Sequence, residues 1–104
     1  MKTDASTDLL VIGGGLAGLA SALHAANAGF SVKLLIKKPF DQTSSHWAQG
    51  GIAAAVGPDD DPELHVADTL DAGAGLCKVA SVQFLAQQAP KAIAWLRDLH
   101  VADR

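Results

Sequence analysis

Three glycines near the N-terminus are spaced so that backbone amides could bind phosphate. Gly13, Gly15 and Gly18 satisfy the pattern G-x-G-x-x-G. In such a turn the first glycine allows a tight bend after a strand, the second lets the backbone approach a pyrophosphate, and the third lets a helix pack closely on a sheet. The helix that begins there directs free N–H groups and the positive end of its dipole at the phosphates. The motif therefore predicts a dinucleotide site, and the alternative is a glycine-rich turn required only for packing.

A second polar segment covers residues 44–51, with the sequence S-S-H-W-A-Q-G-G. From Phe40 to Trp47 the pattern is irregular, which predicts a loop. Hydroxyls, an amide and two glycines supply hydrogen-bonding groups and close backbone approach, and these suit a phosphate or a polar heteroaromatic ring. A surface loop rich in turn-forming residues would have the same composition. The residues alone leave both interpretations open.

The acidic residue of the common NAD-binding pattern is absent. That residue follows the second strand and binds a ribose hydroxyl, whereas Ile36, Lys37 and Lys38 stand there in this chain and Asp41 is the next carboxylate. Its absence argues against ordinary NAD binding. Lys37 could contact a ligand through its backbone or its ammonium group, or it could be a solvated strand end.

The elements that must position these residues form a strand, a helix and a strand. Residues 8–13 form a continuous apolar run, which predicts a strand buried on both faces of a sheet. Residues 16–28 have the three- and four-residue spacing of a helix, and residues 31–36 predict a second strand. Such a unit has parallel strands and a right-handed crossover. The fold class is therefore α/β, with a Rossmann-like, doubly wound architecture.

Further helices are predicted in the second half of the chain. Asp61 is placed to cap a helix over residues 63–71, with Pro62 at its first position. Another helical pattern begins near Ser81, is interrupted at Pro90 and continues to about His100. With only two strands the parallel layer does not close, because a two-stranded sheet is marginal and both faces need covering. The sequence therefore predicts a domain that is incomplete on its C-terminal side.

Composition excludes several classes of protein. The 104 residues include 8 Lys and Arg against 11 Asp and Glu, for a net charge of −3, so there is no basic stripe and we expect no nucleic-acid partner. No apolar run approaches the roughly 20 residues of a membrane span, and no signal-peptide core is present. Cys77, the single cysteine, fits a reducing compartment. We expect a cytoplasmic protein without a metal site.

Three segments together resemble a known family. They are the turn G-G-G-L-A-G, the loop S-S-H-W-A-Q-G-G-I-A-A, and the stretch H-V-A-D-T-L-D-A-G-A-G-L-C that begins at His65. The combination resembles the L-aspartate oxidases, which belong to the FAD-dependent flavoproteins that also include succinate dehydrogenases and fumarate reductases. The similarity runs from about Asp8 to Val101. The second and third segments are specific to this resemblance, whereas the glycine turn alone is not.

The resemblance implies that the cofactor is FAD and assigns contacts to it. It places Gly14, Gly15, Leu16 and Ala17 at the pyrophosphate and Lys37 near the adenosine. Residues near the phosphates and the flavin would be Ser44, Ser45, His46, Trp47, Ala48, Gln49, Gly50 and Gly51. In the membrane-complex succinate dehydrogenases a histidine at the position of Ser44 carries the flavin covalently, so the resemblance implies non-covalent FAD here.

The resemblance also implies an activity. Such enzymes oxidise L-aspartate to iminoaspartate, with oxygen or fumarate as electron acceptor, in the first step of NAD biosynthesis. Residues 1–104 would be the N-terminal part of the FAD-binding domain. The substrate-binding and catalytic residues of this family lie beyond Arg104, so no catalytic residue is expected in this chain. Quinolinate synthase would be a partner by resemblance alone. Two alternatives are a succinate dehydrogenase or fumarate reductase relative and a non-catalytic remnant that binds a nucleotide weakly or not at all.

Overall fold

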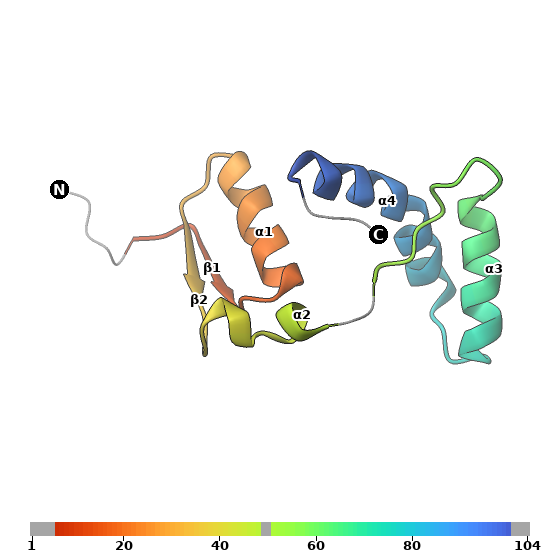
Figure 1. Ribbon diagram of the computed structural model, residues 1–104, viewed down its shortest axis with the longest axis horizontal. Helices are drawn as coiled ribbons and strands as arrows, with labels where there is room; N and C mark the ends of the chain where they lie inside the picture. Colours follow the sequence, from red (N-terminus) through yellow and green to blue (C-terminus); the bar gives the residue numbers. More distant parts are fainter. Residues whose placement is uncertain (1–5, 49–50, 101–104) are drawn as a thin grey trace. The chain divides into compact units, whose positions relative to one another are not determined.

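The computed structural model describes residues 6–48 and 51–100. These residues belong to two units that divide between Gly51 and Ile52. The elements of the first unit are β1 (Leu9–Ile12), α1 (Leu16–Asn27), β2 (Val32–Leu35), the short 3-10 helix η1 (Phe40–Gln42) and α2 (Ser44–Trp47) (Figure 1). Those of the second unit are α3 (Pro62–Gly73) and α4 (Val79–Asp98).

The first unit is the predicted strand, helix and strand. β1 and β2 pair in parallel, with Leu9 opposite Val32 and Ile12 opposite Leu35. α1 connects them and packs on the sheet (Figure 1). At the start of both strands, Asp8 Oδ2 accepts hydrogen bonds from the backbone N and the Oγ of Ser31, at 2.9 and 3.2 Å. Ser31 Oγ in turn accepts from the backbone N of Asp8 at 3.0 Å. These bonds support the register that brings the far ends of both strands to the glycine turn.

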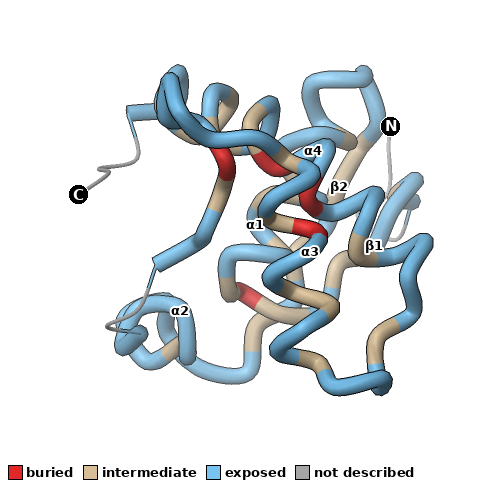
Figure 2. Tube along the Cα trace, turned by 90° about the vertical axis from the view of Figure 1, so that its right-hand side faces the viewer, coloured by how far each residue is buried: buried red, intermediate tan, exposed pale blue. Residues whose placement is uncertain are grey.

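Burial of the strands differs from the prediction. Leu10 is 49% exposed and Ile12 is 76% exposed, and most of the described chain is exposed in Figure 2. Alternate side chains of a strand point to opposite faces of the sheet, and α1 is the element that covers one face. Burial on both faces was therefore the wrong prediction for the described residues, because within the first unit α1 is the helix that packs on the sheet.

The second unit is a pair of packed helices. Asp61 Oδ1 accepts a hydrogen bond from the backbone N of Glu63 at 2.8 Å, and Pro62 begins α3, as predicted. Val66 of α3 is buried, as are Ala86 and Ala89 of α4, and these small side chains allow close contact between helices. Within the described ranges, none of the helices combines the length and the apolar character that crossing a membrane requires.

The predicted interruption at Pro90 is wrong. α4 runs without a break from Val79 to Asp98 and contains Pro90. Proline removes one backbone donor and its ring crowds the carbonyl four residues earlier, which here belongs to Ala86. Ala86 is 1% exposed and Ala89 is 8% exposed, so this part of α4 is held by packing. Tertiary burial therefore outweighs the local cost of the proline, which is about 3 kcal/mol.

The cap of α3 can be tested by substitution. We expect Asp61→Ala to lower the free energy of unfolding of the second unit by about 1 kcal/mol, because the first-turn amide of Glu63 loses its acceptor. Urea denaturation followed by circular dichroism measures the change. Asp59→Ala is the matched control, since it removes the same charge from the same turn and leaves the cap in place. Equal effects of the two substitutions would show that charge, and not capping, stabilises this helix.

Candidate functional site

A cleft of about 400 Å³ lies in the first unit, where β1 ends and α1 begins. Ligands of open α/β sheets bind outside the carboxyl ends of the strands, and this volume is in the lower part of the range of small-molecule sites. The lining residues come from the glycine turn, from α1 and from the segment after β2. They are Gly14, Gly15, Leu16, Leu19, Phe40, Thr43, Ser45 and His46.

The glycine turn lies close to the segment after β2, and Gly14 and Gly15 line the cleft. A Cβ on Gly14 would lie 2.8 Å from Ile36 Cγ2 and 3.1 Å from Phe40 Cε1. A Cβ on Gly15 would lie 3.0 Å from Ser45 Oγ. Side chains at these two positions would therefore fill the space between the turn and the segment after β2.

Gly18 serves the packing of α1 on the sheet. A Cβ at this position would collide with the carbonyl oxygen of Gly13 and lie 2.9 Å from its carbonyl carbon. It would also lie 3.5 Å from Val11 Cγ1. This is the close approach of helix and strand that the third glycine of the motif predicts.

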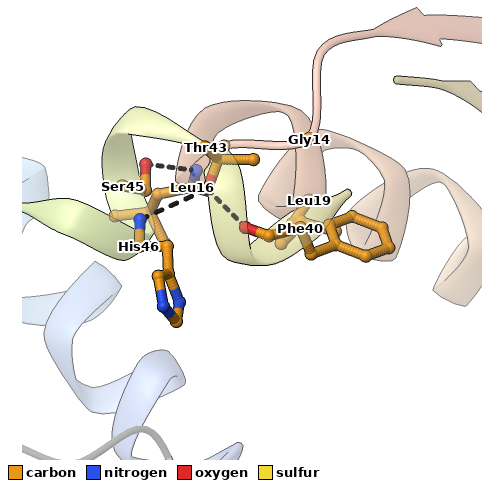
Figure 3. Close-up of a pocket in the computed structure, with 8 residues that line it drawn as sticks. Gly14, Leu16, Leu19, Phe40, Thr43, Ser45 and His46 are labelled. Carbon is orange, nitrogen blue, oxygen red and sulfur yellow. Dashed lines mark hydrogen bonds between the residues drawn. The ribbon is translucent and has the colours of Figure 1, made fainter. Parts of the chain in front are cut away.

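Ser45 contacts the N-terminus of α1. The backbone N of Leu16 donates a hydrogen bond to Ser45 Oγ at 2.9 Å (Figure 3). The first amides of a helix have no carbonyl partner one turn earlier, and the N-cap residue Gly15 has no side chain to accept from them. Ser45 Oγ therefore satisfies an amide at the positive end of α1. A hydroxyl that accepts one hydrogen bond still has a proton to donate.

Thr43 organises the segment after β2. Thr43 Oγ1 donates a hydrogen bond to the carbonyl oxygen of Phe40 at 2.9 Å and accepts one from the backbone N of His46 at 3.2 Å. Figure 3 shows this pair of bonds beside the bond between Ser45 and Leu16. The prediction of an irregular loop from Phe40 to Trp47 is therefore wrong, because η1 and α2 form there. Thr43 is the N-cap of α2, a role that threonine favours.

The structure brings only some of the residues assigned by resemblance to the cleft. Gly14, Gly15, Leu16, Ser45 and His46 line it. Other assigned residues are described but are not part of the lining, namely Ala17, Lys37, Ser44, Trp47, Ala48 and Gly51. Of these, Lys37 is exposed and follows β2 by two positions, and Trp47 is 71% exposed. Gln49 and Gly50 lie outside the described residues.

Three lining residues were missed by sequence analysis: Leu19, Phe40 and Thr43. For Thr43 a signal existed, because a threonine directly before a short polar segment is a candidate helix cap. Leu19 lies one turn after Gly15, whose carbonyl oxygen accepts from the Leu19 amide at 3.0 Å. Phe40 reaches the cleft through its contact with the glycine turn, and no pattern in the sequence indicates that contact.

The chemistry of the lining fits a dinucleotide. Amides of the glycine turn and the Ser45 hydroxyl are hydrogen-bond donors for phosphate oxygens, and the dipole of α1 favours negative charge at the same point. The Thr43 hydroxyl donates its proton to the Phe40 carbonyl oxygen. Leu19 and Phe40 add apolar surface. The eight lining residues include no carboxylate, so nothing in the lining repels an anion. This arrangement can bind and orient a diphosphate.

The fold and the cleft together define a dinucleotide-binding βαβ unit. Residues 8–102 match the family described as "FAD binding domain". The chain belongs to this family, and FAD is its cofactor. The predicted α/β fold class and the predicted cofactor are thereby confirmed.

The chain is similar to named L-aspartate oxidases, the family that its sequence motifs resemble. The chain is 55% identical to an L-aspartate oxidase of Nostoc sp. over 95 residues, which cover 91% of this chain and 16% of the relative. It is 50% identical to an L-aspartate oxidase of Neisseria meningitidis, over 92% of this chain and 18% of the relative. A solved variant of E. coli quinol fumarate reductase FrdA matches with a TM-score of 0.86 and 29% identity, over 94% of this chain and 17% of that chain. The chain thus spans less than a fifth of the length of these proteins.

Proposed function

We propose that this chain supplies the diphosphate-binding part of the FAD site of an L-aspartate oxidase. The observation that carries the proposal is the cleft at the N-terminus of α1, where the Leu16 amide and the Ser45 hydroxyl meet at 2.9 Å. Gly14 and Gly15 both line this cleft, so their backbone faces it. The residues of the chain would therefore hold a diphosphate through neutral donors and a helix dipole, without a lysine in direct contact.

The proposed contacts come from the resemblance, and the cleft supports those of the assigned residues that line it, Gly14, Gly15, Leu16, Ser45 and His46. Gly14, Gly15 and Ala17 would bind the diphosphate with their amides. Leu16 would lie beside it with its amide held by Ser45 Oγ, and Ser45 would donate its hydroxyl proton to a phosphate oxygen. Lys37, which is exposed beyond the end of β2, would lie near the adenosine. The remaining assigned residues, Ser44 and 46–51, would lie near the phosphates and the flavin.

The proposed activity of the whole enzyme is oxidation of L-aspartate to iminoaspartate, with oxygen or fumarate as acceptor, in the cytoplasm. Bound FAD supplies the group that accepts a hydride from such a substrate. The residues of this chain bind and orient that cofactor, and none of them is assigned a catalytic role. The names of the relatives support this activity. A quinolinate synthase partner stays a prediction from resemblance alone.

A succinate dehydrogenase or fumarate reductase relative is the second candidate, and the match to FrdA favours it. The two candidates differ at residue 44. The resemblance places the flavin-bearing histidine of membrane-complex succinate dehydrogenases at this position, which is Ser44 here. A serine hydroxyl does not form a histidyl link to flavin, so non-covalent FAD favours the oxidase.

FAD binding by the chain tests the proposal. We expect titration of the chain into FAD to change the flavin fluorescence saturably, and acid precipitation to leave the yellow colour in the supernatant. Riboflavin is the control ligand, because it carries the same ring without the diphosphate and should bind far more weakly. Absence of saturable FAD binding would contradict the proposed site, and flavin that stays with the acid pellet would contradict non-covalent binding.

A further inference from the structure

We propose that Thr43 is a positioning residue of the diphosphate cleft. This inference rests on the proposed function, since it concerns how the same cleft is shaped. Thr43 is half-buried, whereas the residues that follow it in α2 are exposed. It lines the cleft, and neither the glycine motif nor the family resemblance assigns it a contact to FAD.

The Thr43 hydroxyl joins two short elements. Its proton goes to the carbonyl oxygen of Phe40 in η1, and its oxygen accepts the amide of His46 in α2. The backbone N of Thr43 donates to the same Phe40 carbonyl at 3.2 Å. One side chain therefore fixes the angle between η1 and α2, and an alkyl side chain of the same size could make neither hydroxyl bond.

The two elements that Thr43 joins, η1 and α2, both contact the glycine turn. Phe40 approaches Gly14 so closely that a Cβ on Gly14 would lie 3.1 Å from the ring. Ser45, which lies between Thr43 and His46, accepts the Leu16 amide at 2.9 Å. A Cβ on Gly15 would lie 3.0 Å from Ser45 Oγ, so Ser45 lies close to the backbone of the turn. By holding both contacts in place, Thr43 sets the width of the cleft and the position of the Ser45 hydroxyl.

If Thr43 acted only as a helix cap, its effect on stability would be confined to α2. A cap on the four-residue α2 would stabilise that helix and leave the N-terminus of α1 unaffected. A positioning residue, in contrast, changes the environment of the Leu16 amide, to which Thr43 makes no hydrogen bond of its own. The Leu16 amide is therefore the site where the two roles give different results.

Two variants of the full chain separate these roles. Thr43→Val keeps the size of the side chain and removes the hydroxyl, and Thr43→Ser keeps the hydroxyl. Without FAD, we expect amide hydrogen exchange at Leu16 to be about tenfold faster in Thr43→Val and close to wild type in Thr43→Ser. Exchange at Val11 in β1 should not change. The dissociation constant for FAD should rise about threefold to tenfold in Thr43→Val and return to the wild-type value in Thr43→Ser.

The possible outcomes are distinct. Wild-type exchange at Leu16 and wild-type FAD affinity in Thr43→Val would overturn the positioning role and leave the proposed function intact. The expected exchange pattern in a chain that binds no FAD would support the positioning role and overturn the proposed function. If Thr43→Val also loses protection at Val11, Thr43→Ala replaces it, because alanine removes the hydroxyl and introduces no branched side chain. Slow Leu16 exchange in Thr43→Ala would then overturn the proposal.

Discussion

Replacing Gly18 with alanine is expected to destabilise the βαβ unit by about 3 kcal/mol and to abolish FAD binding. The added Cβ would collide with the Gly13 carbonyl oxygen and would lie 2.9 Å from its carbon. Both are backbone atoms, so no side-chain rotation relieves the contact, and overpacking commonly costs 1–3 kcal/mol or more. α1 would have to move off β1, which displaces the Leu16 amide from the cleft.

Urea denaturation and FAD titration of the same samples measure this effect. Gly57→Ala is the matched control, because a Cβ on Gly57 would meet only Asp60 Cβ, at an ordinary 3.9 Å. We expect Gly57→Ala to resemble the wild type in both measurements. A Gly18→Ala chain with wild-type stability would contradict the close packing of α1 on β1 at Gly18.

The parts of the fold that the sequence predicts well depend on local patterns. The run of apolar residues at β1, the helical spacing of α1 and the cap at Asp61 each involve neighbours within about one turn or a few residues of strand. The parallel pairing of β1 with β2 follows from these, since a helix between two strands permits a crossover connection. The elements that lead to the cleft can therefore be located from the sequence alone.

Two of the wrong predictions, a break at Pro90 and burial of β1 on both faces, concern features that depend on contacts between distant segments. Pro90 has the local signature of a helix break, and the burial of Ala86 and Ala89 on α4 outweighs it. Leu10 and Ile12 have the composition of a strand buried on both faces, but burial depends on what packs there. Contacts of this kind are not encoded in any single stretch of sequence.

The same reason explains the incomplete prediction of the site. The glycine turn was located from its spacing, because its chemistry is local to residues 13–18. Phe40 and Thr43 belong to the cleft through hydrogen bonds and packing that join the segment after β2 to that turn. The resemblance placed Ser45 near FAD, and the structure adds the partner of its hydroxyl, the Leu16 amide.

Replacing Ser45 with alanine is expected to weaken FAD binding about tenfold to a hundredfold. The variant loses the proposed donor to a phosphate oxygen, and hydrogen bonds to charged groups are worth about 1.5–3 kcal/mol. It also leaves the Leu16 amide without its acceptor in the free chain, which makes that amide available to the ligand and offsets part of the loss. The net effect is therefore expected near the lower end of this range.

Parallel titrations with FAD and ADP locate the effect at the diphosphate. Both ligands carry that group, so Ser45→Ala should weaken them by similar factors, whereas a contact to the flavin ring would weaken FAD alone. Ser45→Thr keeps the hydroxyl and should bind both ligands like the wild type. Ser21→Ala is the matched control, because Ser21 bonds within α1 to the Ala17 carbonyl oxygen at 2.8 Å and is not part of the cleft lining. Wild-type affinity of Ser45→Ala for both ligands would mean that the Ser45 hydroxyl supports α1 without contacting phosphate.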